Sequence, residues 1–149
     1  MTAEYATLNR SEAVVTCAHI LRQNRFIVAL TTVPVDDHAS IAAEVILAIG
    51  DTDAVVDGAA LRSHDEADAA VRMVRSAALA GRLAVVLNAN RAAPGHLWSL
   101  ACAAQMNDGR LLTIGDGLMY RLSPDDAVFR IVHHGGPLFD AALAKTNKP

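Results

Sequence analysis

The length, composition and charge of the chain limit what it can be. Its 149 residues fit one domain and suffice for a full hydrophobic core without disulfides or structural metals. The net charge is −3, from 13 basic and 16 acidic residues, and no basic run occurs, so nucleic acid is not expected as a partner. Aromatic residues make up only 4%, which argues against platforms that stack bases or sugars.

The amino-terminal residues and the two cysteines bear on the cellular compartment. Residues 1–4 carry neither the basic nor the apolar region of a signal peptide. No apolar run approaches the ~18 residues of a membrane-spanning helix. Cys17 and Cys102 lie far apart within helical patterns and are expected to be buried, reduced thiols. These features predict a cytoplasmic protein with no membrane partner.

The first part of the chain alternates helical and extended patterns. The polar residues 1–10 are expected to be irregular and flexible. A helix follows, with Ser11 as its N-cap and apolar residues at helical spacing. The apolar run 25–33 predicts a strand that is buried on both faces. Asp37 then caps a second helix, which Gly50 ends.

The middle of the chain contains the clearest helix start and the clearest strand. After a short strand at 53–58, Ser63 and Glu66 have the spacing of a capping box and begin a third helix. Leu83–Leu87 is an apolar run that stops at polar residues, and it predicts a buried central strand. Pro94 then begins a fourth helix, because proline is favoured in the first turn.

The pattern changes toward the carboxyl end of the chain. Residues 110–117 predict a further strand and its exit. The alternating segments 118–122 and 128–132 flank a turn that contains proline, and together they predict a β-hairpin. A short final helix is expected to end at Ala144, and residues 145–149 are expected to be flexible.

The regular alternation of helix and strand determines the expected fold class. It predicts an α/β protein, a three-layer sandwich with a mostly parallel sheet of the Rossmann-like or flavodoxin-like kind, to which the C-terminal hairpin is added. An antiparallel edge is common on such a sheet. No linker and no internal repeat are visible, so residues 1–149 are expected to form a single domain.

Polar residues follow the predicted strands at the points where they end. Because the carboxyl ends of parallel strands meet at one edge of the sheet, where ligands of open α/β sheets bind, we expect these side chains to share a rim. The residues at strand exits are Thr31, Thr32, Asp57, Asn88, Asn90, Arg91 and Asp116, and those on the adjoining loops and helix starts are Asp36, Asp37, His38 and His96.

Three of these residues are candidates for catalysis. Asp57 and Asp116 can act as a base or as hydrogen-bond acceptors. His96 stands near the start of a helix, where the positive end of the helix dipole favours the neutral imidazole, which can act as a base or an electrophile. The same position favours a neutral ring at His38.

The other rim residues are candidates for binding a ligand. Arg91 lies just before the helix that Pro94 begins, and an arginine beside a helix start suits a phosphate or a carboxylate. The ligand-binding candidates are therefore Asp37, His38, Asn88, Asn90 and Arg91.

Several well-defined site types are missing from the sequence. Gly115-Asp116-Gly117 is not the glycine pattern of a dinucleotide site, and no phosphate-binding loop with its lysine is present. No histidine pair has metal-ligand spacing, and no serine stands in a nucleophile elbow. We therefore predict no metal site, and the sequence specifies no cofactor.

One segment resembles a known family. The stretch from Leu87-Asn88 to Leu111-Leu112-Thr113-Ile114-Gly115-Asp116-Gly117 is similar to the strand, helix and strand run of the small DsrE/DsrH-type sulfur-relay proteins. No cysteine of this chain occupies an obvious sulfur-carrying loop, so the resemblance implies no functional residue here.

Two functions therefore remain open, and whether the chain is an enzyme stays undecided. The first is a protein that binds, or transforms, a small and anionic molecule at the carboxyl rim. The second is a non-catalytic assembly subunit that forms homo-oligomers through apolar helices or through the hairpin at 118–132. The sequence slightly favours the first function.

Overall fold

The computed structural model describes residues 6–23, 27–32, 38–50, 52–116 and 127–131. The strands are β1 (Ala6–Leu8), β2 (Ile27–Thr32), β3 (Thr52–Asp57), β4 (Leu83–Leu87), β5 (Arg110–Asp116) and β6 (Ala127–Ile131). The helices are α1 (Arg10–Arg22), α2 (His38–Ile49), α3 (His64–Leu79) and α4 (Pro94–Met106), with short 3₁₀ helices η2 (Gly58–Ala60) and η3 (Ala89–Arg91).

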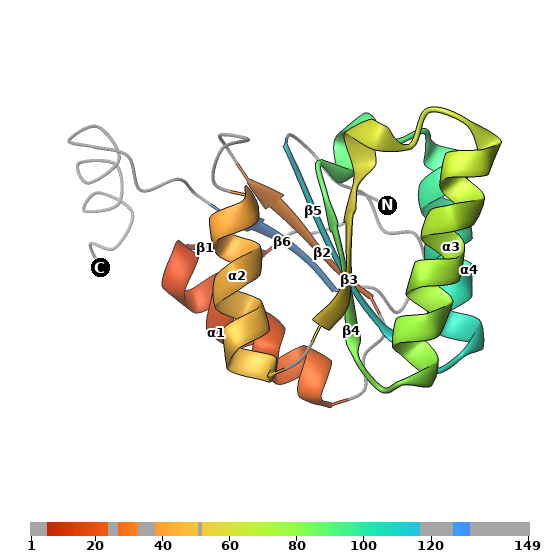
Figure 1. The fold of residues 1–149 in the computed structure, drawn as a ribbon. Helices are drawn as coiled ribbons and strands as arrows, with labels where there is room; N and C mark the ends of the chain where they lie inside the picture. Colours follow the sequence, from red (N-terminus) through yellow and green to blue (C-terminus); the bar gives the residue numbers. More distant parts are fainter. Residues whose placement is uncertain (1–5, 24–26, 33–37, 51, 117–126, 132–149) are drawn as a thin grey trace, which may run out of the picture.

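The strands form one six-stranded sheet in the order β1-β6-β2-β5-β4-β3. Every pairing between the described strands is parallel. Figure 1 shows α1 and α2 on one side of the sheet and α3 and α4 on the other. The expected α/β fold, three layers around a parallel sheet, is therefore confirmed.

The strand β4 shows why the sheet is buried on both faces. Its side chains alternate: Leu83 and Val85 belong to the cluster packed with α1 and α2, and Ala84 and Val86 belong to the cluster packed with α3 and α4. All four are at most 1% exposed. A run of apolar residues without polar alternation therefore predicts a central parallel strand, and β4 does lie between β3 and β5.

The helix starts follow local side-chain chemistry. The backbone N–H of Glu66 donates to Ser63 Oγ at 3.2 Å, as the capping-box spacing predicted, and Pro94 occupies the first turn of α4. The prediction for α1 was wrong by two positions. Asn9, not Ser11, is the N-cap, because its Oδ1 accepts from the N–H of Glu12, three residues on.

The amino-terminal segment is more ordered than its polar sequence predicted. Residues 6–8 form β1, which pairs in parallel with β6 at one edge of the sheet. The pairing stabilises a three-residue strand whose own sequence carries little signal. The expectation that residues 1–10 are irregular is therefore wrong for this strand and for the start of α1.

The predicted hairpin is only partly within the described residues. Its second strand corresponds to β6, which lies between β1 and β2 and is parallel to both. Among the described residues β6 is therefore an interior strand of the sheet. Residues 118–122, the predicted final helix and the tail at 145–149 lie outside the described residues.

In the part of the chain that the structure describes, no helix combines the length and the apolar character needed to cross a bilayer.

Candidate functional site

The exits of β3 and β4 are joined by a pair of side chains. Asn88 Nδ2 donates a hydrogen bond to Asp57 Oδ1 at 3.0 Å. The same carboxylate oxygen accepts from the backbone N–H of Ala59 at 3.0 Å, so Asp57 is also the N-cap of η2. The Asp57 carboxylate therefore connects the ends of two neighbouring strands, through a residue 31 positions away in the sequence.

The electrostatics of Asp57 follow from these contacts. The hydrogen bond from Asn88 is the largest cause that lowers the pKa of the Asp57 carboxyl, followed by the hydrogen bond from Ala59. A small opposing effect of burial raises this pKa, and the positive charge of Arg91 lowers it further. Hydrogen bonds to the charged form keep a carboxylate ionised, so Asp57 carries a negative charge at neutral pH.

The backbones of the two strand exits also approach closely. A Cβ atom added to Gly58 would lie 2.3 Å from the carbonyl oxygen of Asn88, so only glycine fits there. Asn88 has a φ of 52°, in the left-handed region that asparagine tolerates better than most residues. The geometry of the two strand exits thus requires glycine at position 58 and favours asparagine or glycine at position 88.

A second cluster forms where α3 and α4 begin. The rings of His64 and His96 meet edge to face, with centroids 5.8 Å apart. His96 Nδ1 lies 3.3 Å from the carbonyl oxygen of Leu61. Because a carbonyl oxygen only accepts, Nδ1 of His96 carries the proton of this contact, and in the neutral ring Nε2 keeps its lone pair as an acceptor.

The structure separates the predicted catalytic residues. Asp57 ends β3 and Asp116 ends β5, with β4 between them, so two strand spacings, about 10 Å, separate the two strands, and Asp116 lies further along β5 than the position level with Asp57. Asp116 pairs in register with Thr32 of β2, and the placement of its side chain lies outside the described part. His96 lies on the α4 side of the sheet. Of the three, Asp57 and His96 have described side chains, and these bond to different partners: Asp57 to Asn88 and Ala59, and His96 to the Leu61 carbonyl.

The predicted ligand-binding residues divide in the same way. Asn88 and Arg91 accompany Asp57, and Asn90 is exposed in η3 between them. His38 is the first residue of α2 and only 2% exposed, on the opposite face of the sheet from α4. Asp37 lies outside the described residues. The strand ends do share one edge of the sheet. The candidate residues on the adjoining helix starts, however, lie on both faces of the sheet, His38 on the α2 side and His96 on the α4 side.

Sequence reasoning missed Gly58, His64 and the Leu61 carbonyl. Gly58 follows Asp57 directly, and an Asp-Gly pair at a strand end was a usable signal for a tight turn. His64 is the first residue of α3 and is exposed, yet its ring contacts that of His96. The helices α3 and α4 cover the same face of the sheet, so residues at their starts lie close together. The sequence does not state which face each helix covers.

Neither a metal nor a cofactor is specified by these groups. No cluster of three or more histidine, cysteine or acidic side chains with the geometry for a metal ion occurs among the described residues. The thiol of Cys17 is fully buried within the α1 and α2 layer, and burial raises its pKa to about 12, so it is no nucleophile at neutral pH.

Comparison of the chain with protein-family models, with curated proteins and with solved structures gave no match.

Proposed function

We propose that this protein binds a small anionic molecule over the carboxyl edge of its sheet, above the end of β5, which lies between β4 and β2. One observation supports this placement above the others. The chain leaves β2 for α2 on one face of the sheet and leaves β4 for α4 on the opposite face. Where connections from strands of one sheet diverge to opposite faces, an open α/β sheet forms the crevice in which its ligands bind.

The charge around this crevice favours an anion. The helices α2 and α4 both begin at this edge, and the amino end of a helix attracts negative charge. Arg91 is exposed in η3, the turn that connects β4 to α4. An arginine beside a helix start binds phosphate and carboxylate groups through its planar fork of donors.

The side chains also suggest how roles would divide if the protein is an enzyme. Asp57 is ionised, but its Oδ1 is engaged by Asn88 and Ala59, so it is better suited to hold the strand exits than to accept a proton. His96 is held by the Leu61 carbonyl with Nε2 as acceptor, which makes it the better candidate base. Asp116 remains a candidate through its place at the end of β5.

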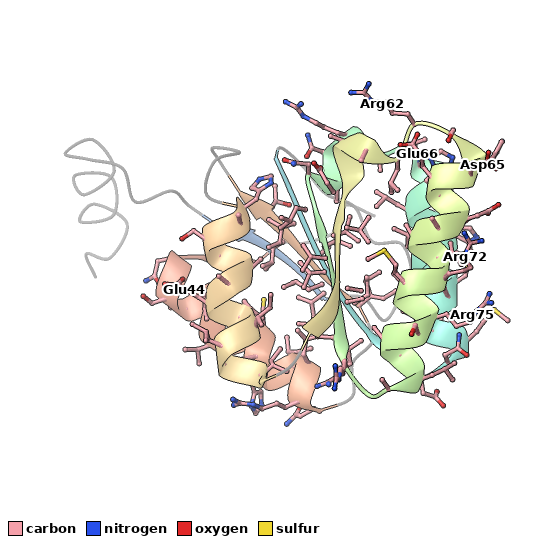
Figure 2. The ribbon with its side chains drawn as sticks, in the orientation of Figure 1. Glu44, Arg62, Asp65, Glu66, Arg72 and Arg75 are labelled. Carbon is pink, nitrogen blue, oxygen red and sulfur yellow. The ribbon has the colours of Figure 1, made fainter. Side chains whose placement is uncertain are left out.

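A thermal-shift screen with nucleotides, sugar phosphates and small carboxylic acids tests the proposal. We expect at least one of these anions to raise the melting temperature of the native protein, and Arg91→Ala to abolish that increase. Arg75→Ala is the matched control, because this exposed arginine lies on the outer side of α3 (Figure 2). An anion that stabilises wild type and Arg91→Ala equally would contradict the assignment of Arg91.

The alternative, a homo-oligomeric assembly subunit, has its own supporting observation. Several large apolar side chains on the helices are exposed, among them Leu47 at 82% and Met106 at 83%. Multi-angle light scattering of the purified chain separates the two functions. A stable oligomer that Leu47→Glu or Met106→Glu dissociates, together with no response to any anion, would favour assembly.

A further inference from the structure

The strand β3 is the last strand of the sheet among the described residues. It pairs with β4 on one side only, and the sheet order ends with it. An edge strand offers main-chain hydrogen-bonding groups to a further strand. β3 is six residues long, enough for such a pairing.

A groove runs between this edge strand and α3. Its volume is about 290 Å³, and its lining includes Val55, Val56 and Met73. Val55 is 48% exposed and Met73 43% exposed, whereas Val56 is buried. The groove thus has a buried floor at Val56 and a half-exposed apolar wall at Met73. Val55 lies at the strand edge and points to the other face of the sheet, because it is level with Val85.

The helix contributes one stripe to this β3–α3 groove. Glu66, Ala70 and Met73 line it, at the spacing that places residues on one side of a helix. A strand edge that faces a helix across an apolar groove is the arrangement used for β-augmentation, in which an extended peptide adds a strand and inserts alternate side chains.

The charge of the groove is acidic. Asp57 and Glu66 are its ionisable lining residues, at the end of β3 and in the first turn of α3. Figure 2 shows Glu66 beside the end of β3, while Arg72 and Arg75 point away from the strand. The cations of α3 therefore lie on its outer side, and a basic partner meets no repulsion from them.

We propose that the β3–α3 groove binds an extended segment of a partner protein, which adds a strand to β3 and alternates aliphatic with basic side chains. The aliphatic side chains lie on the α3 side of the new strand, against Met73, and the basic side chains lie on its other side, beside Val55 and Asp57. A second copy of this chain fits less well, because β3 carries two aspartates and no basic residue, and like charges on paired strands repel.

The experiment uses the full chain and two synthetic capped hexapeptides, one alternating lysine with valine and one alternating glutamate with valine. Isothermal titration calorimetry measures their binding. We expect the lysine peptide to bind at least about tenfold more tightly than the glutamate peptide. Methylation of alternate backbone nitrogens of the lysine peptide is expected to abolish binding, because it removes the donors that a new strand requires.

Matched variants place the peptide on the groove. Val55→Lys and Met73→Lys are expected to weaken binding of the lysine peptide by about tenfold or more. Leu79→Lys is the control, an exposed apolar residue at the far end of the same helix, and should bind as wild type does. Native circular dichroism of all three variants checks that they fold.

Four results would overturn the proposal. They are equal binding of the two peptides, equal binding of the methylated peptide, no binding at millimolar concentration, and a dimer in light scattering that Val55→Lys dissociates. The last result would assign the groove to a second copy instead. None of them bears on anion binding at the crevice, which Arg91→Ala tests separately.

Discussion

The side-chain amide of Asn88 donates a 3.0 Å hydrogen bond to the Asp57 carboxylate, and this contact joins the ends of two neighbouring strands. It also ties η3, which begins after Asn88, to η2, which Asp57 caps. The corner formed by η2 and η3 borders both proposed sites: Arg91 emerges from it, and Asp57 closes one end of the β3–α3 groove. Changes at this corner are therefore informative about both.

We expect Asn88→Gly to raise the pKa of Asp57 toward the ordinary value of a carboxyl group. The substitution removes the hydrogen bond that lowers this pKa most, and glycine keeps the positive φ at position 88. NMR titration of the Asp57 side chain measures the change. Asn90→Gly, in the same turn, is the control and should leave the Asp57 pKa as it is in wild type.

The stability contributed by Asp57 should depend on pH. Its folded-state pKa is lowered, so the contribution is present above the unfolded-state pKa of about 3.9 and is lost as the pH falls through the folded-state value. At pH 7 we expect Asp57→Ala to lower the free energy of unfolding by about 1 kcal/mol, the usual cost of losing an N-cap.

Urea unfolding at pH 7 and at pH 3 measures this dependence. The difference between wild type and Asp57→Ala should shrink at the lower pH. Asp57→Asn separates the two causes, because asparagine still caps η2 but carries no charge. A wild-type advantage over Asp57→Ala that stays constant down to pH 2 would contradict the role of the charge.

A methyl group at position 58 should be strongly destabilising. Its Cβ would lie 2.3 Å from the Asn88 carbonyl oxygen and 2.9 Å from the Asn88 carbonyl carbon, and a backbone group cannot turn aside as a flexible side chain can. We expect Gly58→Ala to lower the free energy of unfolding by about 3 kcal/mol. Thermal and urea unfolding measure the loss.

Gly95→Ala is the matched control for Gly58→Ala. No atom lies within 4 Å of a Cβ at position 95, and the residue is in the first turn of α4, where alanine is the better helix former. We expect a gain of about 0.5 kcal/mol there. Similar losses at both glycines would mean that the close approach of the two strand exits does not limit stability.

The two cysteines should differ in reactivity. Cys17 is fully buried, and burial raises the pKa of its thiol to about 12, whereas Cys102 is half-buried. In native protein at pH 8 we expect a thiol reagent to label Cys102 first, and Cys17 only on unfolding, because the thiolate is the reactive form. Mass spectrometry of Cys17→Ala and Cys102→Ala assigns each rate, and rapid native labelling of Cys17 would show that the α1 and α2 layer opens readily.

How far the sequence predicts this protein varies from one element to another. The capping box at Ser63, the proline at position 94 and the apolar run of β4 are local signals, and each predicted its element correctly. The strand β1 is three residues long and forms through its pairing with β6, so no local pattern announces it. Likewise, alternation in the sequence of β6 does not say whether a strand has one neighbour or two.

The candidate site shows the same division. That Asp57 and Asn88 stand at strand exits is visible in the sequence, since each follows an apolar run. That they touch depends on β3 and β4 being adjacent, and the separation of Asp57 from Asp116 depends on β4 lying between their strands. The contact of His64 with His96 likewise requires α3 and α4 to cover one face.

By itself the sequence determined the layers of this fold, because hydrophobic periodicity and helix capping act over a few residues and are written into neighbouring positions. Only the tertiary structure decided the strand order, and with it which polar residues meet at the carboxyl edge and which strand is left at the edge of the sheet. Strand order depends on the difference in free energy between complete folds with different strand orders, and this difference is the sum of many long-range contacts. No window of the sequence contains that comparison.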